Sequence, residues 1–146
     1  MNLFGVMGIS ASGLSAERIR AEVVATNMAN AESTHTAEGG PYKRKEVVFQ
    51  SAAPSSFRMQ LAGASAAAST AGGVSVRSIV TDASAPVMRY DPANPDADTS
   101  GFVAYPNINP VLEMTDLIDA SRAYQMNASA VQAAKQMIQQ SLDLLK

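Results

Sequence analysis

The longest stretch of this sequence without glycine or proline lies at its C-terminal end, from Val111 to Lys146. Asn109, just before it, is a favourable N-cap, and Pro110 suits the first position of a helix. Mostly apolar residues then recur at alternating steps of three and four: Met114, Leu117, Ser121, Tyr124, Ala128, Val131, Lys135, Ile138, Leu142 and Leu145. The pattern predicts one helix over residues 109–146, about 50 Å long at 1.5 Å per residue.

A second stripe with the same spacing lies at the opposite end of the chain, within residues 1–33, and Arg18 is its one break. Its members are Phe4, Met7, Ala11, Leu14, Ala21, Ala25 and Met28. Gly5, Gly8 and Gly13 weaken this helix, each by up to about 1 kcal/mol relative to alanine. Two matching stripes predict that the terminal helices pack as a coiled-coil-like pair.

Small and apolar residues also lie outside these two stripes. The additional positions are Ile9, Ala16, Val23, Leu112, Ile118, Ala120, Ala123, Ala130, Ala134 and Met137. A helix that is apolar over more than one seam needs more than one helical partner. This favours an assembling structural protein, while a simple helical hairpin that acts as a soluble adaptor is the alternative.

The middle of the chain, residues 34–108, has a different composition. Four segments are typical of strands: "YKRKEVVFQ" (42–50), "VSVRSIV" (74–80), "APVMRY" (85–90) and "GFVAY" (101–105). The alanine-, serine- and glycine-rich stretch 62–73 predicts a flexible loop. The expected fold class is therefore α+β, with an N-terminal helix in 1–33, a small β-rich domain in 34–108 and a C-terminal helix in 109–146.

Charge and composition exclude several function classes. The net charge is −2, and the basic run 43–45 is too short for a nucleic-acid interface. No apolar run approaches the roughly 20 residues that span a bilayer, so we expect no membrane insertion. The first residues lack the basic start of a cleaved signal peptide, and the absence of cysteine excludes disulfide and thiolate chemistry.

Candidate catalytic and metal-binding residues are few. The single histidine, His35, lies in a polar turn without ligands at metal-binding spacing. Asp96, Asp98 and Ser100 match the first half of a calcium loop, but Asn107 stands where the bidentate glutamate belongs. An Asp-rich turn that closes a hairpin is the better interpretation, and a calcium-binding module is the alternative. We expect no enzymatic activity, no metal and no cofactor.

Two asparagines mark the end of the N-terminal helix. Asn27 and Asn30 are three residues apart and share one helix face. Carbonyl groups at a helix end lack partners, and asparagine side chains can supply donors. We expect both residues to cap this end and to bond to neighbouring helices, with Asn30 in the left-handed conformation that asparagine tolerates.

Both terminal segments resemble a known family. The helix end "ATNMANAES" (25–33) and the segment "SRAYQMNASAVQAAKQMIQQSLDLL" (121–145) are similar to the axial proteins of the bacterial flagellum. The long link "STHTAEGGPYKRKEVVFQ" (33–50) and the lead-in "YDPANPDADTSGFVAYPNINPVLEM" (90–114) resemble the proximal-rod members of that family. Another rod protein such as FlgB is the nearest alternative.

The resemblance implies a structural subunit without catalytic activity. Such proteins leave the cell through the flagellar type III export apparatus without a cleaved signal peptide, and build a hollow, periplasm-spanning rod in the basal body. The rod carries torque and forms part of the export channel. Implied partners are further copies of the chain and the rod proteins FlgB, FlgF, FliE and FlgG. The expected assembly interface comprises Met7, Leu14, Ala21, Asn27, Met28, Asn30, Met114, Leu117, Tyr124, Asn127, Val131, Ile138, Leu142 and Leu145.

Overall fold

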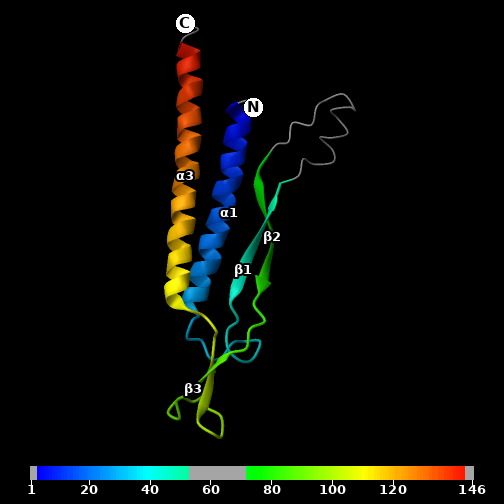
Figure 1. The fold of residues 1–146 in the computed structure, drawn as a ribbon, viewed down its shortest axis with the longest axis vertical. Coiled ribbons are helices and arrows are strands. Elements are labelled where there is room, and N and C mark those ends of the chain that lie inside the picture. The colour runs from blue at the N-terminus through cyan, green and yellow to red at the C-terminus, as the bar shows by residue number, and fades with distance from the viewer. Residues whose placement is uncertain (1–2, 53–71, 144–146) are drawn as a thin grey trace, which may run out of the picture. The chain divides into compact units, whose positions relative to one another are not determined.

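The computed structural model describes residues 3–52 and 72–143 (Figure 1). Its elements are, in chain order, α1 (Leu3–Ala29), β1 (Lys45–Ser51), β2 (Val74–Thr81), β3 (Val87–Tyr90), β4 (Phe102–Tyr105) and α3 (Pro110–Asp143). In chain order the four strands lie between the two terminal helices, in agreement with the predicted α+β class. Residues 62–71 of the predicted flexible loop and Leu145 of the predicted interface lie outside the described residues.

The strands form two separate two-stranded sheets, β1 with β2 and β3 with β4. β3 and β4 are antiparallel, in a register that pairs Val87 with Tyr105 and Tyr90 with Phe102. All four strands overlap the segments predicted from β-branched and aromatic content. Met88, Tyr90 and Phe102 share one face of the β3–β4 sheet, while Val103 on the other face is buried.

The chain divides into two compact units. Unit 1 comprises Met1–Arg18, Phe49–Arg77 and Ser121–Lys146, and unit 2 comprises Ile19–Val48 and Ser78–Ala120. Each helix contributes one part to each unit. In unit 2, the last turns of α1 contact the first turns of α3, where the side chain of Asn27 donates a hydrogen bond to Glu113.

Most buried positions of the described helices are small or polar, with Val24 as the exception. In unit 1 they are Ser10, Ala16 and Ala134; in unit 2 they are Val24, Asn27, Glu113 and Ala120. On α3 the buried positions Glu113, Ala120 and Ala134 each lie one residue before a member of the predicted stripe. The stripe therefore predicts the wrong buried face for this helix. Leu117, Val131 and Ile138 of that stripe are half-buried.

Several large apolar members of the predicted stripes are exposed, while Met7 and Leu14 are half-buried like the three residues of α3. The exposed members include Phe4, Met114, Tyr124 and Leu142, with exposed fractions from 43% to 72%. The shift has a physical reason, because alanine, serine and glycine let two helix backbones approach more closely than leucine or methionine would. The coiled-coil-like packing of the terminal helices through their large apolar residues is not established and stays a prediction.

Candidate functional site

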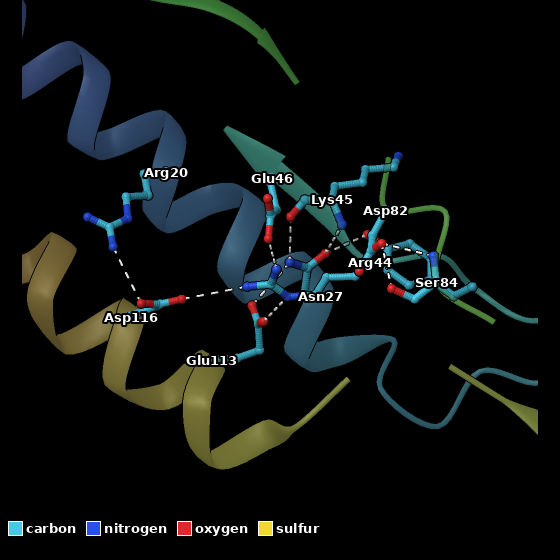
Figure 2. Close-up of polar contacts among 10 residues, drawn as sticks. Arg20, Asn27, Arg44, Lys45, Glu46, Asp82, Ser84, Glu113 and Asp116 are labelled. Atoms are coloured by element: carbon cyan, nitrogen blue, oxygen red, sulfur yellow. Dashed lines mark hydrogen bonds and ion pairs between the residues drawn. The ribbon is translucent and has the colours of Figure 1, made fainter. Parts of the chain in front are cut away.

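Asn27 is the centre of a buried polar cluster in unit 2 (Figure 2). Its side chain is 0% exposed and makes four hydrogen bonds. Nδ2 donates to the backbone carbonyl of Lys45 at 2.8 Å and to Glu113 Oε2 at 3.1 Å. Oδ1 accepts from the Lys45 backbone N–H at 2.9 Å and from the Tyr42 hydroxyl at 3.1 Å. These bonds use both N–H donors and both acceptor sites of the amide.

Glu113 brings a carboxylate into the same cluster from the first turns of α3. Its side chain is 1% exposed, and Arg44 Nε donates to Glu113 Oε1 at 2.6 Å. This hydrogen bond is the main cause that raises the pKa of Arg44, so the guanidinium stays charged. A buried carboxylate is tolerated only with such partners, because burying an isolated charge costs several kcal/mol.

Arg44 extends the cluster towards the surface. It also pairs with Glu46, and its Nη2 lies 3.7 Å from Asp116 Oδ2. Arg20 donates to the other oxygen of Asp116 at 3.4 Å. We call Asn27, Tyr42, Arg44 and Glu113 the polar clamp, because together they join the end of α1, the start of β1 and the start of α3.

Tyr42 is the second residue of the polar clamp, after Arg44, whose pKa is shifted. Burial raises the pKa of its hydroxyl, and the negative charge of Glu113 raises it further. The neutral phenol is therefore the form that the folded unit holds, donating to Asn27. The exposed Lys45 ammonium lies 5.8 Å from the centroid of the Tyr42 ring.

Of the two predicted capping residues, Asn30 caps the end of α1 and Asn27 does not, because the Asn27 amide bonds to Lys45, Glu113 and Tyr42 instead. Asn30 Nδ2 donates to the carbonyl of Thr26 at 2.9 Å and so caps the C-terminal end of α1. No described residue other than glycine has a positive φ, so the left-handed conformation expected for Asn30 is wrong. At the start of α3, Asn109 Oδ1 accepts from the Val111 N–H at 3.0 Å, which confirms the predicted N-cap.

Four large apolar side chains near the buried Glu113 are exposed on the surface of α3. Val111, Leu112, Met114 and Ile118 are 49% to 69% exposed, and we call them the apolar ridge. The usual order of a surface helix is inverted in these turns, because the carboxylate is inside and the aliphatic side chains are outside. An exposed apolar surface of this kind is typical of a protein–protein contact.

The calcium-like segment is a hairpin turn. Asp98 Oδ1 accepts backbone hydrogen bonds from Ser100 at 2.8 Å and from Phe102 at 2.9 Å. Asp96 Oδ2 accepts from the Thr34 hydroxyl at 2.6 Å. Within residues 3–52 and 72–143, no group of three or more His, Cys, Asp or Glu side chains is arranged to hold a metal ion. No described helix is long and apolar enough to cross a membrane.

Sequence reasoning singled out Asn27 but not its partners. The basic run 43–45 carries no sign of a buried partner, and no spacing in the sequence connects Arg44 to Glu113. Position on the helix is a signal, because Val111 and Ile118 lie on the face opposite Glu113. The structure brings Asn27 together with these residues, and in unit 1 it brings Asn127 against Gly13.

Comparison with known proteins identifies the chain. A family model described as "Flagellar basal body rod FlgEFG protein C-terminal" matches residues 99–144. Proteins named flagellar basal-body rod protein FlgC are 36% identical in Borreliella burgdorferi, 37% in Bacillus subtilis and 37% in Salmonella typhimurium. These matches cover 99% to 100% of this chain and 98% to 100% of the relatives.

The class is therefore that of the bacterial flagellar basal-body rod proteins, which are structural proteins of the motility apparatus and not enzymes. Within this class, the chain belongs to the FlgC family. The resemblance to proximal-rod proteins is confirmed, and the chain is a structural subunit of the basal-body rod that associates with other rod proteins.

Proposed function

We propose that the chain assembles through its terminal helices into the proximal part of a hollow rod. In this proposal, residues 1–33 and 109–146 form the inner tube and residues 34–108 form the outer domain. The rod transmits torque, and its inner tube forms part of the export channel.

The observation that carries this proposal is the inversion of the helix surfaces. Small and polar residues such as Ser10, Ala120 and Asn27 are buried within the chain's own units, whereas Phe4 and the apolar ridge are exposed. Exposed aliphatic area is unfavourable in water at about 25 cal/mol per Å², so contact with neighbouring subunits would stabilise the assembled state. Coiled-coil-like packing would then form between the helices of several subunits.

The proposed neighbours follow from membership of the rod. They are further copies of this chain and the rod proteins FlgB, FlgF, FliE and FlgG. The subunit would reach the periplasm-spanning rod through the flagellar type III export apparatus, without a cleaved signal peptide. The predicted interface residues Met7, Leu14, Ala21, Met28, Leu117 and Ile138 are proposed contacts, as are the exposed Met114, Tyr124 and Leu142.

Electron microscopy of basal bodies from a strain that lacks this gene tests the proposal, with a swimming assay alongside. We expect non-motile cells whose membrane rings are present but whose rod and hook are incomplete. The wild-type gene supplied in trans should restore both rod and swimming. Intact basal bodies and normal swimming in the deletion strain would contradict the proposal.

A further inference from the structure

Unit 2 exposes both a projecting and a hollowed apolar surface. The projecting surface is the apolar ridge at the start of α3, formed by Val111, Leu112, Met114 and Ile118. Glu113 is the residue of this helix start that points inward, to Arg44 and Asn27, and these four side chains are exposed instead. Their exposed apolar area is available for contact with another chain.

The hollowed surface lies between α1 and the strands of the same unit. It is an open groove of about 380 Å³, lined by Val23, Thr26, Lys45, Ile79 and Thr81. Val23 and Ile79 give it apolar walls, and both are accessible to solvent. We call it the α1–β2 groove. Its volume leaves room for more than one aliphatic side chain.

We propose that the apolar ridge of one copy of this chain docks into the α1–β2 groove of the next copy. This inference rests on the proposed function, in which copies of the chain assemble into a rod. A contact between two different patches of the same chain is heterologous, and its repetition generates a ring or a helical array. We name a second copy as the occupant because the charges beside the two patches of this chain are complementary.

Charges at the two surfaces are complementary. Lys45 is the charged residue of the α1–β2 groove, and its side chain is exposed. On α3, Asp116 is already paired with Arg20 and Arg44, whereas the exposed Asp119 directly follows Ile118. Opposite charges across a contact set its orientation and exclude wrong partners more than they add affinity. Lys45 and Asp119 would thus orient the ridge in the groove.

Site-specific photo-crosslinking in flagellated cells tests this contact. Leu112 is replaced by p-benzoylphenylalanine in a strain whose only copy of the gene carries the change, and basal bodies are irradiated and analysed by mass spectrometry. We expect a product that joins two copies of the chain, with the crosslinked peptide containing Thr26 or Ile79. The matched control carries the same photo-reactive residue at Ala93, an exposed position in the turn between β3 and β4.

Two further variants sharpen the result. Ile79→Asp replaces an apolar wall of the groove by a charged carboxylate that the aliphatic ridge cannot pair, so the product from position 112 should be lost. Lys45→Glu should reduce the product, and Lys45→Glu with Asp119→Lys should restore it.

A product that joins position 112 to a different protein, or to another surface of a second copy, would overturn the inference. So would assembled rods that give no product from position 112. In either case the rod itself is built, so the proposed function would stand. The proposed function would be contradicted by a different result, namely intact basal bodies and normal swimming in the deletion strain.

Discussion

The side-chain amide of Asn27 pairs with both backbone polar groups of Lys45. Asn27 Nδ2 donates to the Lys45 carbonyl at 2.8 Å, and the Lys45 N–H donates to Asn27 Oδ1 at 2.9 Å. A side chain at the end of α1 thereby acts as the hydrogen-bonding partner of the first residue of β1. The direction in which the chain returns from the helix end is fixed by two atoms of one residue.

Truncating this side chain should destabilise unit 2 strongly. Asn27→Ala leaves the backbone groups of Lys45 and the hydroxyl of Tyr42 without their partner, and we expect a loss of about 3 kcal/mol in the free energy of unfolding. Asn30→Ala is the matched control, because Asn30 is only half-buried and bonds within its own helix end, and it should cost less than about 1 kcal/mol. Urea denaturation followed by circular dichroism measures both, and equal losses would contradict the role given to Asn27.

The charge of Glu113 should matter more than that of Asp116. Glu113→Gln keeps the shape of the side chain but removes the charge that faces Arg44, and we expect a loss of about 2 kcal/mol. Asp116→Asn changes a partly exposed ion pair and should cost less than about 1 kcal/mol. Urea denaturation of the two single variants, side by side at neutral pH, measures this difference. A larger effect of Asp116→Asn would show that the buried pair is not the stronger one.

Stability should fall at alkaline pH through Tyr42. Burial and Glu113 raise the pKa of Tyr42 in the folded state, so the folded chain holds the phenol proton more tightly than the unfolded chain. This contribution is complete below about pH 10 and is lost as the pH rises towards the higher folded-state pKa. Tyr42→Phe should lower stability at neutral pH by about 1 kcal/mol, through the lost bond to Asn27, and should flatten the alkaline decline.

Thermal unfolding between neutral and alkaline pH, with tyrosinate absorbance recorded in parallel, measures this effect. Tyr124→Phe is the control, since Tyr124 is exposed on α3. An alkaline decline that is equally steep in Tyr42→Phe and in the wild-type chain would contradict the assignment.

Gly13 should resist substitution, whereas Gly8 should not. A Cβ at Gly13 would lie 2.9 Å from Asn127 Oδ1 and 3.0 Å from Cγ and Nδ2, whereas a Cβ at Gly8 would meet nothing within 4 Å. Asn127 is held in place because its Nδ2 donates to the carbonyl of Ala123 at 2.9 Å. Gly8→Ala should therefore stabilise α1 by up to about 1 kcal/mol, and Gly13→Ala should lose this gain to the clash.

Circular dichroism during thermal unfolding compares the two alanine variants. Gly13→Ala together with Asn127→Ala should recover the stability, because the second change removes the atoms that the new methyl group meets. If Gly13→Ala were as stabilising as Gly8→Ala, the close contact in unit 1 would be absent in solution.

The helices and strands were predictable because their signals are local. Asn109 and Pro110 mark the start of α3, and alternation in "GFVAY" marks β4. The buried faces were not predictable in the same way. The heptad rule places the largest apolar residues in the seam, and here Met114 lies outside while Glu113 lies inside. The burial of Glu113 depends on its ion pair with Arg44, which is 69 residues away in the sequence and is brought close only when the chain folds.

In the candidate site, too, local features were predictable from the sequence and contacts between distant residues were not. The helix-end position of Asn27 is readable from the sequence, and so is the capping role of Asn30. The left-handed conformation was a wrong inference, because the Asn30 amide satisfies the Thr26 carbonyl directly. The close approach at Gly13 needed the partner Asn127, which no spacing rule connects to it.

The central claim is that the apolar residues exposed on the surfaces of the helices build the rod. Electron microscopy of basal bodies tests it most directly, in a strain that carries Leu112→Ser with Ile118→Ser as its only copy of the gene. A control strain carries Gln132→Ser with Gln136→Ser, two exposed polar positions of α3. The account predicts that both chains fold, as judged by circular dichroism, and that only the control completes a rod. Complete rods in both strains would contradict it.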